Sequence, residues 1–234
     1  ADTNKLWKYG APEETQALLK NLFYPVPSDA VAPFGNHWIG GTPYGQVDVM
    51  QVDDESTIAD LRRYDLLVFG GWNTMMRLEK DVLERYVREG GTLVMSRPQM
   101  TTRIDRDYKN YIDKDLMSLF DFLPPVGKPG EYVEKKFGKG RYILFTGKDF
   151  PAASKEGKAA FLKLVSSLAA EVNQTVRISS ADGEYVKYIA YGVYNKKIYF
   201  LNADTIKERT FTYEIGGKKT ELTLKPCEIK VVKR

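Results

Sequence analysis

The chemistry open to this chain is narrowed most by its single cysteine, Cys227, and its single histidine, His37. One cysteine cannot form a disulfide within the chain or a cysteine-based zinc site, and one histidine cannot form a two-histidine metal site. Every mechanism in which a histidine activates a serine or cysteine nucleophile would have to use His37. These counts remove many mechanisms, and a metal ion could be held only through oxygen ligands.

Ser96 is the serine that could serve as a nucleophile, because it follows a short apolar run, Thr92–Met95. It would need His37 as its base, and the loop Gly35–Trp38 could in principle fold over the end of the strands. A serine at the end of a strand is usually a turn residue, and we expect that role for Ser96.

Two acidic groups, Asp53–Glu55 and the pair Asp105 and Asp107, contain the paired carboxylates that glycosidase chemistry requires. Asp53–Glu55 reads as a solvated strand end without the glycine and spacing of a calcium loop. Asp105 and Asp107 alternate with Arg103 and Arg106, as surface ion pairs do. We therefore predict no catalytic residue, no metal and no cofactor, and a hydrolase using Ser96 or an acidic pair is the least favoured alternative.

Aromatic residues beside the predicted loops are better candidates for contacting a ligand. A sugar stacks on an exposed aromatic ring while a few polar neighbours hold its hydroxyls. Two other interpretations stay open: the tryptophans pack the loops onto the domain, or they dock a partner chain. The predicted substrate-binding residues are Trp38, Tyr44, Trp72, Asn73, Arg97 and Arg103.

The elements that must position these residues alternate between strands and helices. Val47–Val52 alternates in polarity like a strand, whereas Leu66–Phe69 and Thr92–Met95 are short apolar runs typical of buried parallel strands. Between these runs, apolar residues at helical spacing from Leu78 to Val87 predict an amphipathic helix that ends at Gly90–Gly91. This order predicts an open, mostly parallel α/β sheet.

The same domain extends in both directions from these elements. Upstream, Pro12–Phe23 predicts a helix, and the Pro- and Gly-rich segment Pro25–Gly45 predicts a long loop without the features of a phosphate loop. Downstream, Tyr132–Lys136 and Tyr142–Thr146 predict strands and Lys155–Ala170 predicts a helix.

The sequence pattern changes near Asn173, where short predicted strands begin to recur at regular spacing. Tyr194–Lys197 and Ile215–Lys218 are hairpin turns. The sequence therefore predicts an α/β domain over residues 1–173 and a small antiparallel β-sandwich over residues 174–234. The predicted strands are 176–179, 186–194, 197–202, 209–215, 220–224 and 228–232.

The composition is that of a soluble globular protein, with 43% hydrophobic and 28% charged residues in a chain of 234. The net charge of +4 is spread along the chain, which disfavours a nucleic-acid partner. No apolar stretch approaches the roughly 20 residues of a membrane span. The start, Ala1–Asn4, lacks the pattern of a signal peptide. We expect no membrane association, and both a cytoplasmic location and secretion after processing stay open.

Five segments of the chain follow one another in a familiar order: Asp48–Asp54, Leu61–Gly71, Leu83–Ser96, Gly138–Asp149 and Thr223–Val232. Taken in this order, they resemble the class I glutamine-amidotransferase-like superfamily. The likeness is strongest to the trimerisation domain and following C-terminal β-domain of β-galactosidase-type glycoside hydrolases. It covers most of residues 47–234, while 24–46 has no counterpart.

The resemblance implies a flavodoxin-like sheet. It also shows that this chain lacks the nucleophilic cysteine of a working amidotransferase. A working amidotransferase has a nucleophilic cysteine at the turn after a central strand, where this chain has Ser96–Pro98. We therefore expect a non-catalytic accessory or oligomerisation region of a carbohydrate-active enzyme. The implied partner is a catalytic glycoside hydrolase domain or chain, and homo-oligomerisation stays open. A free-standing saccharide-binding module is the alternative.

Overall fold

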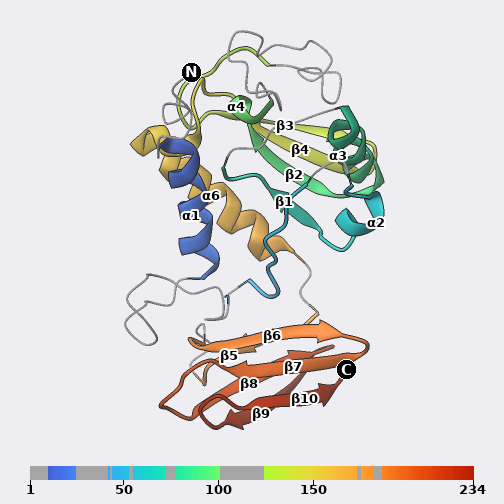
Figure 1. Ribbon diagram of the computed structural model, residues 1–234, viewed down its shortest axis with the longest axis vertical. Helices are drawn as coiled ribbons and strands as arrows, with labels where there is room; N and C mark the ends of the chain where they lie inside the picture. The colour runs from blue at the N-terminus through green and yellow to red at the C-terminus, as the bar shows by residue number, and fades with distance from the viewer. Residues whose placement is uncertain are drawn as a thin grey trace. The chain divides into compact units, whose positions relative to one another are not determined.

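The computed structural model describes residues 10–24, 42, 44–52, 55–71, 77–100, 124–172, 175–181 and 186–234 (Figure 1). They divide into two compact units. The described residues of the first fall within Ala1–Leu19 and Met50–Glu171, and those of the second within Lys20–Val49 and Val172–Arg234. The second unit therefore takes residues from two separate parts of the chain.

The first unit is built on a four-stranded mixed sheet in the order β1-β2-β4-β3. Strands β1, β2 and β4 are parallel, and β3 pairs antiparallel with β4. This confirms the predicted mixed α/β architecture with parallel strands. The strands are β1 (Leu66–Val68), β2 (Thr92–Ser96), β3 (Tyr132–Phe137) and β4 (Gly140–Phe145).

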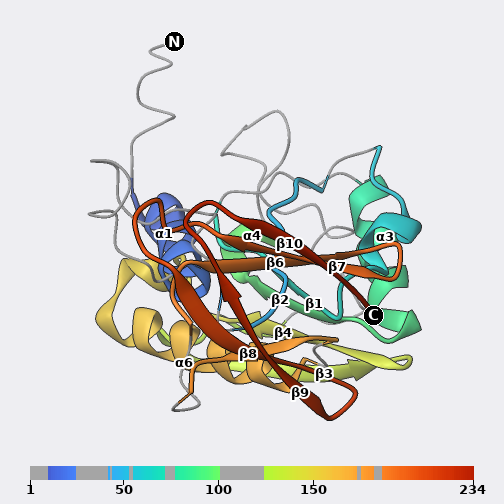
Figure 2. The same ribbon diagram turned by 90° about the horizontal axis from the view of Figure 1, so that it is seen from below.

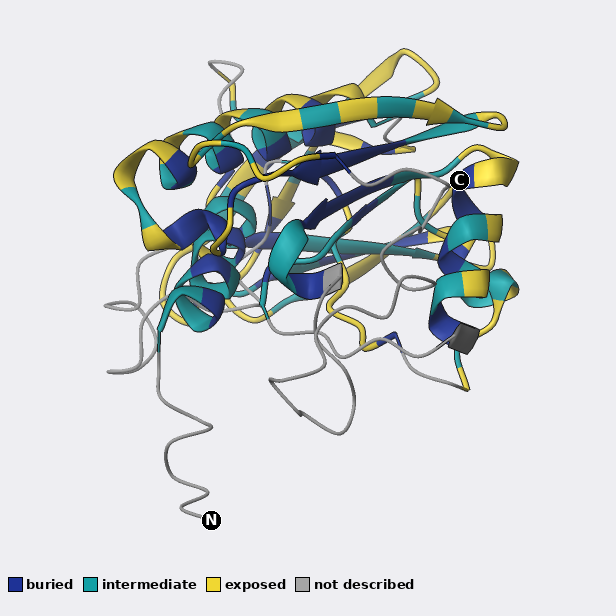
Figure 3. Cartoon of the chain, turned by 90° about the horizontal axis from the view of Figure 1, so that it is seen from above, coloured by how far each residue is buried: buried dark blue, intermediate teal, exposed yellow. Residues whose placement is uncertain are grey.

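Both faces of the central strands are buried, as their continuous apolar runs predict. On one face Leu93 lies beside Tyr142 and Met95 beside Leu144, and these residues share a core with the helix α3 (Arg77–Glu89). Alternate residues turn to the opposite face. Figure 3 shows buried residues concentrated on the strands and on the helix faces that turn toward them.

Helices flank this sheet on both sides (Figures 1 and 2). One side carries α3, and the other carries α6 (Lys155–Glu171), whose Phe161 ring packs against Phe145 of β4 with 5.5 Å between ring centroids. Both helices are amphipathic. Their apolar residues recur at helical spacing and form the one face of each helix that packs against the sheet. The other helical segments among the described residues are α1 (Ala11–Phe23), α2 (Ile58–Leu61), α4 (Arg97–Met100) and η4 (Pro151–Ala153).

The predicted strand at Val47–Val52 is wrong, since the backbone there is irregular. A strand needs a neighbour to share its hydrogen bonds, and no described strand pairs with this segment. The carbonyl of Val47 instead accepts a hydrogen bond from the Tyr24 hydroxyl at 2.8 Å. Only Val52 enters the core of the first unit, while Val49 and Met50 stay exposed.

The second unit contains two three-stranded antiparallel sheets in the orders β10-β7-β6 and β5-β8-β9. Their inner faces share one core, which includes Ile198 and Phe200 of β7 and Phe211 and Tyr213 of β8. The strands are β5 (Arg177–Ser179), β6 (Ile189–Tyr194), β7 (Lys197–Asn202), β8 (Arg209–Ile215), β9 (Lys218–Leu224) and β10 (Ile229–Lys233).

Both predicted hairpins are present and have the expected turn chemistry. Asn195 and Lys196 have φ values of 47° and 60°, and Gly216 and Gly217 have values of 55° and 82°. Two successive positive φ angles match the right-handed twist of the flanking strands, which is why Asn and Gly are favoured there. The turns thus determine the pairing of β6 with β7 and of β8 with β9.

Candidate functional site

The carboxyl ends of β1, β2 and β4 are the natural place for a site, because open α/β sheets bind ligands at this edge. The groups there are Phe69–Gly71 after β1, Ser96–Gln99 at the end of β2 and Thr146–Asp149 after β4. Of the predicted site residues, Arg97 lies at this edge. Trp72 and Asn73 follow the first group in sequence but lie outside the described residues.

Ser96 is held in a buried hydrogen-bonded knot at this edge. The side-chain oxygen of Gln99 accepts hydrogen bonds from the Ser96 backbone N–H at 2.7 Å and from the Ser96 hydroxyl at 3.2 Å. The Gln99 amide nitrogen donates to the Gly71 carbonyl at 2.8 Å. Ser96 is 2% exposed and Gln99 is 0% exposed. This knot therefore joins the end of β2 to the loop after β1.

The knot does not activate the serine as a nucleophile. An activated serine donates its proton to a base that can take it, and a neutral amide oxygen cannot do so. His37, the base that the sequence offers, lies outside the described residues. In the described geometry Ser96 is the last residue of β2, and its N–H and hydroxyl are both hydrogen-bonded to Gln99.

The end of β1 is covered by the helix α1. A side chain at Gly70 would place its Cβ 2.5 Å from Leu19 Cδ1 and 2.8 Å from Gln16 Oε1. A side chain at this position would force the ends of the Leu19 and Gln16 side chains to shift, so glycine suits the close approach of the helix. Thr15 fixes α1 further, because its hydroxyl accepts a hydrogen bond from the Ala152 N–H at 3.0 Å. Helix packing therefore fills this part of the edge.

Arg97 and Tyr44 are the predicted site residues that the structure describes, and they lie in different units. Arg97 donates from its guanidinium to the Pro124 carbonyl at 2.6 Å. The Tyr44 ring packs edge-on against Phe23, with 5.5 Å between centroids, and burial raises the pKa of its hydroxyl. Both side chains therefore have structural contacts.

The remaining residues of the sequence hypotheses lie outside the described residues, apart from Glu55, which occupies an exposed turn, and Cys227. Cys227 is exposed on a turn of the second unit. Among the described residues, no group of three or more His, Cys, Asp or Glu side chains could hold a metal ion. The residues outside the described part are Trp38, Trp72, Asn73, Arg103, His37, Asp53, Asp54, Asp105 and Asp107.

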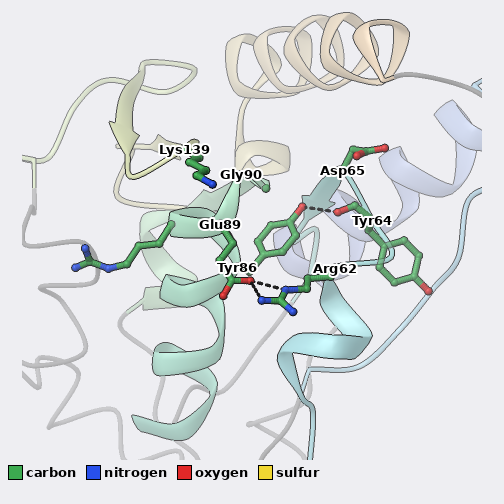
Figure 4. Close-up of a pocket in the computed structure, with 9 residues that line it drawn as sticks. Arg62, Tyr64, Asp65, Tyr86, Glu89, Gly90 and Lys139 are labelled. Carbon is green, nitrogen blue, oxygen red and sulfur yellow. Dashed lines mark hydrogen bonds and ion pairs between the residues drawn. The ribbon is translucent and has the colours of Figure 1, made fainter.

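A surface depression of about 600 Å³ lies at the opposite edge of the sheet, where the parallel strands begin (Figure 4). No sequence pattern marks its residues as a site, although the Gly90–Gly91 pair in its lining marks the turn after α3. Its lining comes from the segment before β1, the end of α3 and the turn between β3 and β4. The lining residues are Arg62, Tyr64, Asp65, Tyr86, Arg88, Glu89, Gly90, Gly91 and Lys139.

The charged groups of the depression are largely paired with one another. Glu89 accepts hydrogen bonds from Arg85 and Arg62, and these bonds lower the pKa of its carboxyl group. Arg88 pairs with Glu84 at 2.8 Å, and its guanidinium carbon lies 4.0 Å above the centre of the Phe137 ring. Exposed pairs of this kind are worth about 0–1 kcal/mol each. They brace the end of α3.

Tyr86 forms the floor of the depression. Its hydroxyl donates to the Tyr64 carbonyl at 3.1 Å and lies 3.3 Å from the Thr92 carbonyl oxygen. Burial is the main cause that raises the pKa of this phenol, with a further contribution from Asp65. The Tyr86 hydroxyl thus joins α3 to the segment before β1.

No protein-family model matches the chain, and no curated protein matches it. Among solved structures, a GH42 β-galactosidase from G. stearothermophilus is 15% identical with a TM-score of 0.42, covering 75% of this chain and 32% of that chain. A rhamnosidase from Novosphingobium sp. is 16% identical with a TM-score of 0.42, covering 71% and 16%.

An exo-carrageenase GH42 from Bacteroides ovatus is 14% identical with a TM-score of 0.38, covering 92% of this chain and 25% of that chain. The chain spans about a third of the length of the β-galactosidase and a quarter of that of the carrageenase. The structural similarity is thus to glycoside hydrolases, at low identity and over part of their length. No helix in the described part of the chain is long and apolar enough to cross a membrane.

Proposed function

We propose that this chain is a non-catalytic accessory region of a carbohydrate-active enzyme, which helps to assemble the enzyme or to shape the rim of its active site. The observation that carries the proposal is the buried knot of Ser96, Gln99 and Gly71. It occupies the turn after a central parallel strand, where an amidotransferase would present a cysteine nucleophile. The ordered sequence resemblance over residues 47–234 supplies the kind of enzyme.

The proposal includes the finer architecture that the resemblance implies. The first domain, residues 1–173, is a flavodoxin-like, amidotransferase-like α/β domain, and residues 174–234 form a β-sandwich domain. Three parallel strands flanked by helices on both faces support the first part. Two antiparallel sheets with a shared core support the second. Fold alone does not establish activity, so the function must be tested directly.

The first test separates a structural Ser96 from a catalytic one. Gln99→Ala removes an acceptor and a donor that serve buried groups, so it should lower the free energy of unfolding by about 2–4 kcal/mol. Ser96→Ala leaves the bond from the Ser96 N–H to Gln99 intact and should cost less than about 1 kcal/mol. Urea unfolding measures both. Release of ammonia from glutamine or cleavage of a glycoside by the wild type, abolished by Ser96→Ala, would overturn the proposal.

The second test asks what the chain accompanies. The intact mass of the native protein from its source, with any co-purifying chain identified, should exceed 26.6 kDa or reveal a stable catalytic partner. Glycosidase activity should then belong to the whole assembly. A native mass of 26.6 kDa without a partner would contradict the accessory role and return attention to the saccharide-binding alternative.

That alternative rests on Trp38 and Trp72 and stays a prediction from the sequence. If it holds, Trp38→Ala and Trp72→Ala should weaken binding in a glycan screen while the protein stays folded. An assembly region would instead change its oligomeric state. The contacts of Tyr44 and Arg97 with their own units give the saccharide interpretation no added support.

A further inference from the structure

The outer face of the β10-β7-β6 sheet carries an unusual set of side chains for a solvent-facing surface. Strand register places its residues in three cross-strand rows, two of them apolar and the third basic and aromatic. The rows are Ile229–Leu201–Ala190, Val231–Tyr199–Gly192 and Lys233–Lys197–Tyr194. We call these nine residues the outer patch.

The outer patch is exposed, and its apolar character is specific to this sheet. Ile229 is 63% exposed, Val231 is 48% exposed and Tyr194 is 67% exposed. A Cβ added at Gly192 would meet nothing within 4 Å. A solvated sheet face normally carries polar residues, and contiguous exposed apolar side chains mark interaction sites.

The other sheet of the sandwich provides the internal comparison. Its outer face pairs Thr210 with Thr223, whose hydroxyls are 2.8 Å apart, and Thr212 with Glu221. The polar side chains of that face can hydrogen-bond to water, whereas the apolar side chains of the outer patch cannot. The contrast within one small unit argues that the outer patch is covered in the working protein.

The charges of the outer patch indicate what covers it. Strands β6, β7 and β10 contain no aspartate or glutamate. Lys197 and Lys233 stand directly opposite each other, and like charges in this position are destabilising. Within the described residues neither lysine forms an ion pair. A surface that brings carboxylates to this pair would relieve the repulsion while its apolar centre covers Ile229 and Val231.

The size of the outer patch argues against a second copy of the chain as its occupant. With strands about 4.8 Å apart and same-face residues about 7 Å apart, nine residues cover on the order of 300 Å². A stable interface between separate molecules buries about 800 Å² per partner. A second copy would also bring the same lysines and no carboxylate from these strands. A smaller contact suffices within an assembly that is held together elsewhere.

We propose that the outer patch docks an acidic, apolar-centred surface of the catalytic part of the enzyme, and this inference rests on the proposed function. The apolar rows supply the buried centre of the contact. Lys197 and Lys233 supply its charged rim and select the acidic partner surface. The β-sandwich is thereby assigned a docking role.

Zero-length cross-linking of the native assembly tests the docking directly. A carbodiimide joins a lysine amine to a carboxylate in contact with it, and peptide mass spectrometry then identifies the pair. Cross-links from Lys197 and Lys233 to aspartates or glutamates of the catalytic part are expected. Cross-links to residues 10–171 of the same chain, to a second copy, or none from either lysine would overturn the inference.

A pair of variants tests whether the outer patch contributes to the affinity for the catalytic part. Val231→Glu places a carboxylate in the apolar centre of the outer patch, where it would face the apolar centre of an acidic partner surface, and should reduce the share of chain recovered with the catalytic part about tenfold. Thr223→Glu introduces the same group on the polar outer face of the other sheet and should leave recovery unchanged. Thermal unfolding confirms that both variants fold. Equal recovery of both variants would contradict the docking site.

The two proposals fail in different ways. A native protein without any catalytic part refutes the proposed function, and the docking site falls with it. A native assembly that contains a catalytic part but shows neither the cross-links nor the Val231→Glu effect refutes the docking site alone.

Discussion

Cys227 occupies a backbone conformation that suits glycine better than cysteine. It follows Pro226 in the turn Lys225–Glu228, which is closed by a hydrogen bond from the Glu228 N–H to the Lys225 carbonyl at 3.1 Å. Its φ is 58°. Proline followed by a residue with positive φ is the signature of a type II turn, where glycine is normally required. A residue with a Cβ pays about 1–2 kcal/mol for this conformation.

We therefore expect Cys227→Gly to raise the free energy of unfolding by about 0.5–1 kcal/mol, after the greater freedom of glycine in the unfolded chain is counted. Cys227→Ala is the matched control, because it removes the thiol and keeps the Cβ. It should leave the stability nearly unchanged. Urea unfolding of both variants in a reducing buffer measures the difference, and equal stabilities would refute the strain.

Asp204 organises the loop after β7. Its carboxylate accepts hydrogen bonds from the N–H groups of Ile206 and Lys207, at 2.9 and 3.0 Å, and from the guanidinium of Arg209. Burial by itself would raise the pKa of this carboxyl group, but the hydrogen bonds and the charge of Arg209 outweigh burial and lower it. The neighbouring Asn202 side chain is fully buried, and its amide nitrogen lies within hydrogen-bonding distance of the Lys207 carbonyl in this loop and of the Leu224 and Lys225 carbonyls at the end of β9.

The lowered pKa of Asp204 gives the second unit a defined acid sensitivity. Because the carboxyl group is more acidic when folded, it contributes stability above its unfolded pKa near 3.8 and loses it as the pH falls further. Asp204→Asn should lower the free energy of unfolding at pH 7 by about 1–3 kcal/mol and flatten the acid-side slope. Hydrogen exchange over residues 186–234 at a series of pH values measures this. An unchanged slope would contradict the assignment.

At the scale of elements, the start of β4 and the end of α3 are in backbone contact. A Cβ on Gly140 would lie 2.3 Å from the carbonyl oxygens of both Val87 and Gly91. These are backbone atoms, so they cannot move aside as the end of a side chain can. The glycine therefore determines how closely the helix approaches the sheet.

Gly140→Ala should accordingly cost about 2–3 kcal/mol of unfolding free energy, at the upper end of overpacking effects. Gly192→Ala is the control, since Gly192 is also a strand glycine but has open space around its Cβ position. It should be neutral or slightly stabilising, because alanine loses less backbone freedom on folding. Thermal unfolding of the two variants measures their stabilities. Equal losses of stability would show that a clash of the added Cβ is not the cause.

At the scale of the whole molecule, the two units have separate cores. The first is centred on Leu83, Leu93 and Leu144, and the second on Phe200 and Phe211. Each unit includes residues distant in sequence, and the two cores have no residue in common. Units with their own cores are expected to unfold as separate cooperative systems.

Calorimetry of the full chain should therefore show two transitions. Gly140→Ala should lower the midpoint of one by about 5–10 °C, and Asp204→Asn should lower only the other. A single transition lowered by both substitutions would show that the units unfold together.

Local patterns in the sequence were enough to predict most elements of both units. The apolar runs Leu66–Phe69 and Thr92–Met95 became parallel strands, and the hairpins at Asn195–Lys196 and Gly216–Gly217 formed as predicted. Val47–Val52 failed because alternation indicates a strand only when a neighbouring strand is available to pair with it. Of the predicted site residues, only Tyr44 and Arg97 have described positions.

The sequence by itself determined the element types, the turn chemistry and the absence of a cysteine at the end of β2, because each depends on residues close together in the chain. Tertiary structure alone decided that Gln99 reaches Gly71 and that Gly70 admits Leu19. It also decided that Lys197 faces Lys233 on an apolar sheet. These contacts join residues far apart in sequence, and packing and strand register, which no local pattern encodes, bring them together.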